Sequence, residues 1–242
     1  MTRLLAIETS SAWCSVALSL GDRAPLFRHE LVSAGASQLL LPWVEELLLE
    51  ANEKLSDLDA IAVGIGPGAF TGVRLAVAVV QGLATAAGLP VLPIVSLDAI
   101  AAQVVTSASF AKLNQTHFAV AIDARMNEIY WAKYEFDSSS VHAIRLGEIH
   151  LSKPEEIDLT GIYYLAGSAI QMYGDRLLAH SKLPSNALDS SIAISALGVL
   201  DCAKYMLYLK QQIQVAKLEP LYIRNKVALT TSEREIAFKK DR

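Results

Sequence analysis

The sequence predicts an α/β fold of two similar lobes, each a mixed β-sheet with helices. Residues 60–106 alternate between continuous apolar runs, typical of buried strands, and longer runs with helical periodicity. Residues 6–10 and 121–125 share one pattern, an apolar strand that ends in an acidic side chain and continues into a short polar turn. A strand, a glycine turn and a helix at 60–87 have a weaker counterpart at 163–179. This internal repetition indicates a duplicated unit.

Length and composition allow two lobes with substantial cores. The chain has 242 residues, of which 52% are hydrophobic, and its repeats divide it into lobes at residues 1–108 and 109–242. A net charge of -4 argues against a protein whose whole surface binds nucleic acid. Cys14 and Cys202 lack metal-ligand spacing, and the acidic Glu8 follows the N-terminus too closely for a signal peptide. We therefore expect a cytoplasmic protein with reduced thiols and no membrane association.

The first lobe is expected to open with a three-stranded antiparallel meander at residues 4–7, 14–20 and 24–29. A helix at 37–51 follows, with Leu40, Val44 and Leu47 at helical spacing and with Pro42 at its start or at a bend. The central strand is expected at 60–65.

A glycine-rich turn then leads into an unusually apolar helix at 72–87. Gly66, Gly68 and Gly72 allow positive φ or close backbone approach, and Thr71 is expected to cap the helix. The polar side chains of the helix, Arg74, Gln81 and Thr85, fall on one narrow stripe. The small residues Ala78 and Gly82 would let a second backbone approach. The helix is too short to span a bilayer, so it is either a core helix or a helix that binds a partner.

The remaining elements are expected as follows: strands at 91–95, 118–122, 129–136 and 163–166, and helices at 97–106, 169–179 and 192–209. Ser96 is the predicted cap of the first of these helices. Residues 137–184 otherwise predict only loops and short strands. The last residues, which include Arg234, Lys239 and Lys240, form a locally basic tail that could add weak phosphate contacts.

Two acidic side chains at strand ends are candidates for an active or vestigial phosphate site. Glu8, followed by the hydroxyls of Thr9 and Ser10, ends the first strand of one lobe, and Asp123 ends the first strand of the other. Together with Gly66 and Gly68, these residues could hold metal and phosphate in a cleft. The alternative is that both acids only cap turns. The turn after Asp123 has no glycine to let backbone amides surround a phosphate, which weakens an active nucleotide site.

Other catalytic and metal motifs are incomplete. The glycines around Gly66 fit a dinucleotide-binding fingerprint, but the acid expected about 20 residues later is missing. The turn also lacks the lysine of a phosphate-binding loop. The five histidines show no HxxH or HExxH spacing, so we expect no metal site and no catalytic residue.

Four segments together resemble the TsaB (YeaZ) family, which takes part in forming N6-threonylcarbamoyladenosine in tRNA. They are LLAIETS at 4–10, GIGPGAFTGVR at 64–74, DARMNEIY at 123–130 and PLYIR at 220–224. The second is long and specific, and the similarity covers nearly the whole chain. The resemblance implies the actin-like (ASKHA, ribonuclease H-like) two-lobed fold. The sequence departs from the family at Glu8, where many relatives have aspartate, and at Asn127, where glycine is usual.

The resemblance also implies a role, that of a non-catalytic subunit which pairs with a TsaD-like transferase and works with a TsaE-like ATPase. ATP and magnesium would then be bound only through the complex, tRNA would be contacted indirectly, and the chain alone would form a homodimer. The partner surface would combine the helices at 37–51 and 72–87. Its expected residues are Leu40, Val44, Leu47, Arg74, Ala78, Gln81, Gly82 and Thr85.

Two alternatives stay open on the sequence. The chain could be an ATPase or an ATP-dependent phosphotransferase that acts alone through Glu8 and Asp123, or it could be a stand-alone homodimer with a different client.

Overall fold

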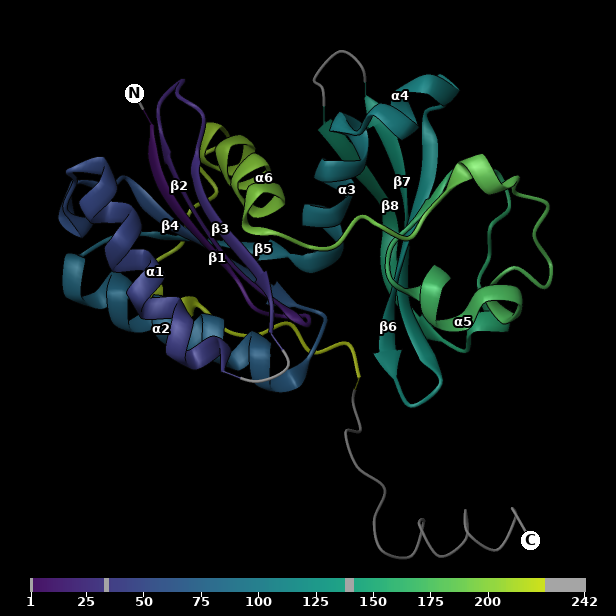
Figure 1. The fold of residues 1–242 in the computed structure, drawn as a ribbon, viewed down its shortest axis with the longest axis horizontal. Coiled ribbons are helices and arrows are strands. Elements are labelled where there is room, and N and C mark those ends of the chain that lie inside the picture. Colours follow the sequence, from purple (N-terminus) through teal and green to yellow (C-terminus); the bar gives the residue numbers. More distant parts are fainter. Residues whose placement is uncertain (1, 33–34, 138–141, 225–242) are drawn as a thin grey trace, which may run out of the picture.

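The computed structural model describes residues 2–32, 35–137 and 142–224, and it contains two five-stranded sheets (Figure 1). The strands of the first sheet are β1 (Arg3–Glu8), β2 (Trp13–Leu20), β3 (Leu26–Leu31), β4 (Ala60–Gly66) and β5 (Val91–Val95), in the order β3-β2-β1-β4-β5. Those of the second are β6 (His117–Arg125), β7 (Glu128–Asp137), β8 (His142–Ser152), β9 (Leu165–Ala166) and β10 (Leu188–Asp189), in the order β10-β9-β6-β7-β8.

The two sheets have the same topology. In the first, β1 and β2 and then β2 and β3 pair antiparallel, while β1, β4 and β5 run parallel. In the second, β6, β7 and β8 form the same meander, and β6, β9 and β10 run parallel. The duplication that the acidic strand ends predicted is therefore present strand for strand.

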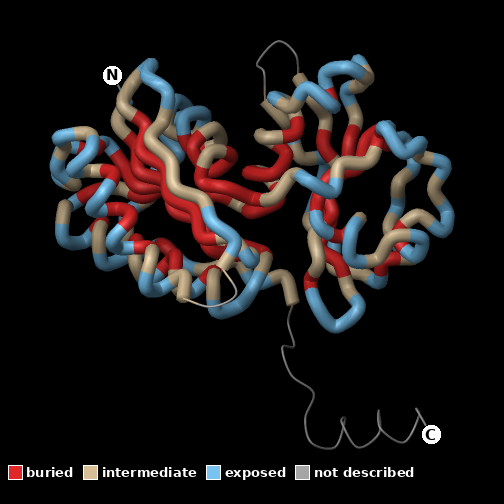
Figure 2. Tube along the Cα trace, in the orientation of Figure 1, coloured by how far each residue is buried: buried red, intermediate tan, exposed pale blue. Residues whose placement is uncertain are grey.

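Helices cover both faces of each sheet. They are α1 (Ala36–Ala51), α2 (Phe70–Ala87), α3 (Ser96–Thr106), α4 (Ala108–Leu113), α5 (Ala169–Leu177) and α6 (Ala196–Tyr208). In Figure 1, α1 and α2 lie on the outer face of the first sheet, and α6 and α3 lie between the two sheets. The central strands are buried on both faces, whereas the outer helices are exposed on one side (Figure 2).

Alternation along the strands sends side chains into separate cores. Leu5 and Ile7 of β1 pack against α1 and α2, whereas Leu4 and Ala6 belong to a core that also contains side chains of α3, α6 and the second sheet. This second core, which we call the central core, extends from one lobe into the other through α3 and α6. The lobes are therefore joined by packing as well as by the chain.

Several predicted boundaries differ from the structure. Helix α2 begins at Phe70, so Thr71 lies inside it, and Ala69 is its N-cap. Helix α3 begins at Ser96 itself, with Val95 as its N-cap. Pro42 lies within α1, which starts before it. Strand β8 was missed, because it is an edge strand with no regular apolar alternation.

The boundary expected at residue 108 separates the strands of the two sheets, but a segment from beyond it packs on the first sheet. Helix α6 contacts β1, β2, β4 and β5 of the first sheet, although it comes from the second half of the sequence. The hydroxyl of Ser15 on β2 accepts a hydrogen bond from the amide of Ala196, the first residue of α6. The C-terminal quarter of the chain thus returns to the N-terminal lobe.

Candidate functional site

Glu8 ends the central strand of the first sheet, and its side chain is completely buried. One carboxylate oxygen accepts a hydrogen bond from the amide of Ser10, and the other, Oε2, is buried with no protein partner. Gly64 on the neighbouring strand β4 makes room for it, since a Cβ there would lie 1.7 Å from Oε2. Nearby, the hydroxyl of Ser10 lies 3.1 Å from that of Ser96 at the start of α3. Glu8 is therefore packed into the protein interior.

Burial raises the pKa of Glu8 from 4.5 to about 7, because a carboxylate loses its hydration in this environment. The hydrogen bonds from Ser10 and Thr9 lower the pKa but do not offset the burial. A metal ion that held a phosphate would need an accessible charged carboxylate as its ligand, which Glu8 does not offer here.

The turn that follows Glu8 sits directly on the start of α2. The hydroxyl of Thr9 donates to the carbonyl of Gly72 at 2.7 Å, and the amide of Ala69 donates to the carbonyl of Ser10 at 2.6 Å. Because a Cβ at Gly68 would lie 2.3 Å from the carbonyl oxygen of Ser10, this close approach requires glycine. The helix N-terminus, where an anion was expected, is thus covered by the backbone of the chain itself.

Replacing Gly72 with alanine is expected to destabilise the protein by about 3 kcal/mol or more. The new Cβ would lie 1.8 Å from the carbonyl oxygen of Thr9, and neither backbone can move without disturbing β1 or α2. Urea unfolding followed by circular dichroism measures the change. Gly82→Ala in the same helix is the control, because no atom lies within 4 Å of its Cβ. That substitution should stabilise the protein by roughly 0.5–1 kcal/mol, and equal behaviour of the two variants would contradict the packing described.

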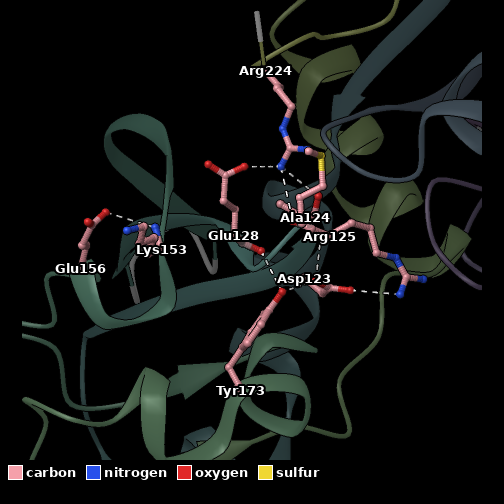
Figure 3. A network of polar contacts seen from close by, with 9 residues as sticks. Asp123, Ala124, Arg125, Glu128, Lys153, Glu156, Tyr173 and Arg224 are labelled. Atoms are coloured by element: carbon pink, nitrogen blue, oxygen red, sulfur yellow. Dashed lines mark hydrogen bonds and ion pairs between the residues drawn. The ribbon is translucent and has the colours of Figure 1, made fainter. Parts of the chain in front are cut away.

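Asp123 holds the position in the second sheet that Glu8 holds in the first, but its carboxylate is bound by its own lobe (Figure 3). Oδ1 accepts hydrogen bonds from the amide of Arg125 and from the hydroxyl of Tyr173, both at 2.8 Å. Oδ2 lies 3.3 Å from a guanidinium nitrogen of Arg125. Burial, together with the neighbouring Asp123 carboxylate, raises the pKa of Tyr173 to about 12, so this hydroxyl remains a donor.

The turn after Asp123 has a left-handed backbone without any glycine. Arg125, Met126 and Asn127 have φ angles of 62°, 57° and 59°. Such angles are unfavourable for residues with a Cβ, so the turn must be stabilised from outside. Figure 3 shows Arg224, which comes from the end of the described chain, with its guanidinium directed at this turn.

The two acidic side chains are each held within their own lobe. Glu8 is enclosed by Ser10 and Gly64, and Asp123 is held by Arg125 and Tyr173. Within the ranges 2–32, 35–137 and 142–224, no three histidine, cysteine or acidic side chains are grouped so that they could hold a metal ion. Both carboxyl groups accept hydrogen bonds from neighbouring residues of their own lobes, so the arrangement supports packing between elements of the fold.

The other predicted site lies on α2, whose outer face is exposed. Val73, Ala76, Val77, Val80 and Ala84 are buried against the sheet. The opposite face presents Arg74, Ala78, Gln81, Gly82 and Thr85, all of which are exposed as the sequence suggested. By length and hydropathy α2 could cross a membrane, but its buried face packs on β4 as a helix of the sheet layer does.

The prediction for α1 selected the wrong face. Leu40, Val44 and Leu47 are 0%, 3% and 0% exposed and belong to the core beneath α1, so they offer almost no accessible surface to a partner. The exposed apolar residues of this helix are Leu41 and Leu49, at 49% and 73%. A shallow groove of about 430 Å³ lies beside the C-terminal part of α1, between this helix, residues 53–55 and Leu83 of α2. It is lined by Leu41, Val44, Glu45, Leu48, Leu49, Glu53, Lys54, Leu55 and Leu83.

Arg74 and Gln81 have partners within the chain. The side-chain amide of Gln81 donates to the carbonyl of Leu218 at 2.8 Å, and Nε of Arg74 donates to the hydroxyl of Tyr222 at 2.8 Å. The guanidinium of Arg74 also lies 3.6 Å from the ring centroid of Phe70. These two side chains fix the C-terminal segment along one flank of α2, which leaves Ala78, Gly82 and Thr85 as the open part of the face.

Relatives with this fold are known. A family model described as TsaD, tRNA N6-adenosine threonylcarbamoyltransferase, matches residues 29–228. The tRNA threonylcarbamoyladenosine biosynthesis protein TsaB of Escherichia coli is 34% identical over 232 residues, which are 93% of this chain and 96% of that protein. TsaB of Haemophilus influenzae is 34% identical over 233 residues and covers 93% of this chain and 94% of its own.

Solved structures agree with these sequence matches. YeaZ from Pseudomonas aeruginosa superposes with a TM-score of 0.79 at 36% identity, over 92% of this chain and 100% of the other. A second Pseudomonas aeruginosa structure, described as an uncharacterized protein with similarity to peptidase YeaZ, gives a TM-score of 0.80 at 35% identity over 93% and 100%. The similarity therefore extends over both lobes.

Proposed function

Because this chain belongs to the TsaB (YeaZ) family, and thereby to the wider family that the TsaD model describes, we propose that it is the supporting subunit of a tRNA-modifying complex. In this role it binds a TsaD-like transferase and supports the formation of N6-threonylcarbamoyladenosine in tRNAs that read ANN codons. The chain itself carries out no step of the transfer.

The observation that carries this proposal is the exposed face of α2 together with the groove beside α1. Ala78 and Gly82 are small and exposed, so a second helix can approach the α2 backbone closely. Leu41 and Leu49 add large apolar side chains that a monomer leaves in water. Exposed apolar patches of this kind typically mark protein–protein contacts.

The buried acids support the non-catalytic part of the proposal. Glu8 is inaccessible, and the carboxylate of Asp123 is fully engaged by its own lobe. ATP and magnesium would then act only through the partner complex, with a TsaE-like ATPase, and tRNA would be contacted indirectly. In the absence of a partner the same apolar face would pair two copies of the chain, so we propose a homodimer in isolation. A cytoplasmic location follows from the proposed substrate.

Reconstitution tests the proposal. Purified TsaD-like partner, TsaE-like ATPase, tRNA, ATP and threonylcarbamoyl donor are incubated with and without this chain, and the modified nucleoside is measured by mass spectrometry. We expect product only when the chain is present. Equal product without it would contradict the supporting role.

We further expect the isolated chain to show no ATP turnover, because neither acid can hold a metal–phosphate complex in the geometry described. Isothermal titration with ATP and magnesium and a phosphate-release assay measure binding and turnover. Turnover that survives further purification and disappears in Asp123→Ala would instead favour an ATPase or phosphotransferase that acts alone.

A further inference from the structure

The last described residues, 213–224, form a segment with one 3-10 turn at Val215–Lys217, which we call the strap. Ile213 pairs with Val91 at the edge of the first sheet. The carbonyl of Leu218 accepts the hydrogen bond from Gln81, and the amide of Leu221 donates to the carbonyl of Ile65 at 2.8 Å. The strap thus follows the first lobe from the start of β5, along α2, to the end of β4.

The strap ends in the other lobe. Arg224 lies on the left-handed turn between β6 and β7, where its Nη2 is 3.1 Å from the carbonyl oxygen of Ala124 and 3.4 Å from that of Arg125. The same nitrogen is 2.5 Å from Oε2 of Glu128, and only 14% of the Arg224 side chain is exposed. Nη2 carries two N–H groups, which the three acceptors share, and its positive charge strengthens the contact with the carboxylate of Glu128.

The position of this contact matters because the lobes meet elsewhere through the central core. In Figure 1, α3 and α6 join the two sheets in the middle of the molecule, and the strap passes below them from the first lobe toward the β6–β7 turn. A contact away from the packed junction resists rotation of one lobe against the other more effectively than a contact at the junction.

We propose that the strap is a latch between the lobes, with Arg224 and Glu128 as its closing pair. Through Arg74 and Gln81 the latch ties α2 to the second lobe, so it fixes the angle between them. When the Arg224 contacts are lost, the strap separates from Ile65 and the lobes rotate about α3 and α6. Arg224 and Glu128 are therefore positioning residues for the whole molecule.

The test uses Arg224→Met in the full chain, which keeps the length of the side chain and removes its donors. Hydrogen exchange measured by NMR reports strap opening at the Leu221 amide. We expect exchange there to accelerate about tenfold or more, as follows from the loss of a charged hydrogen bond. Exchange of the β1 amides should stay unchanged, since β1 lies in the centre of the first sheet.

Lobe motion is measured in the same variant by electron–electron double resonance. Spin labels are attached to cysteines introduced at Asp22 and Asp175, which are exposed and lie on different lobes. We expect one narrow distance distribution in the parent and a broader or shifted one in Arg224→Met. Arg28→Met is the matched control, because Arg28 makes a 2.9 Å ion pair with Glu50 inside the first lobe.

The outcomes separate the latch from general loosening. If Arg224→Met folds and both readouts equal those of the parent, or if Arg28→Met broadens the distances equally, the proposal is wrong. If Arg224→Met does not fold, Glu128→Gln takes its place, since it removes the charge but keeps the carbonyl contacts. Faster Leu221 exchange and broader distances in that variant support the latch, and parent-like values overturn it.

Discussion

Glutamate in place of Ala78 is expected to weaken association with the TsaD-like partner about 100-fold or more while the fold persists. Ala78 is exposed in the centre of the open face of α2, so the monomer can accommodate the longer side chain in water. In a close helix–helix contact, however, the new carboxylate would clash and lose its hydration without a cationic partner. An unpaired buried charge costs several kcal/mol of association. Titration calorimetry against the purified partner measures the effect.

The control must carry the same change on a different surface. Ala111 on α4 is also an exposed helical alanine, and Ala111→Glu should bind the partner normally. Gln81→Glu is a less suitable control, because it would place a carboxylate against the carbonyl of Leu218. If Ala78→Glu folds by circular dichroism and binds with parental affinity, the partner surface lies elsewhere on the molecule. Sedimentation of the same variant tests whether the proposed homodimer uses this face.

The overall architecture could be predicted from the sequence because it depends on local patterns that occur twice. The acids at Glu8 and Asp123 each end a continuous apolar strand, and the strand order is the same around both. The weaker elements were predicted less well. The strand expected at 163–166 is present as the two-residue β9, but β8 was missed, because it is an edge strand in which neither face is consistently apolar and period-two alternation is absent.

Which residues of α1 and α2 are exposed was predicted in part. On α2, three polar residues mark the exposed stripe, and the neighbouring small residues are exposed with it. On α1, leucines occur on both faces, so helical periodicity alone could not distinguish the buried Leu40 and Leu47 from the exposed Leu41 and Leu49.

Contacts between distant parts of the chain gave no sequence signal. Arg74 and Tyr222 are separated by 148 positions, and Glu128 and Arg224 by 96. Each pair consists of residue types that are common on protein surfaces. Their proximity depends on the return of the chain to the first lobe through α6, which packing against the first sheet determines. A single sequence without this packing information could not indicate that the PLYIR segment crosses between the lobes.

Replacing Glu8 with glutamine is expected to stabilise the protein at pH 8 by about 3 kcal/mol, and to have little effect near pH 4. The carboxyl group has a pKa near 4.5 when exposed and about 7 in the folded protein. Below pH 4.5 it is protonated in both states and contributes no pH-dependent free energy. Between pH 4.5 and 7 the unfolded chain loses the proton while the folded chain keeps it, so the free energy of unfolding falls. Above pH 7 the carboxyl group is charged in both states, and the free energy of unfolding no longer changes with the titration of Glu8.

Glutamine is neutral throughout and keeps a carbonyl oxygen for the amide of Ser10. Urea unfolding between pH 4 and 8 measures the difference, with the exposed Glu148→Gln as control. A constant difference between Glu8→Gln and the parent over this range would contradict a buried carboxyl that titrates near neutrality.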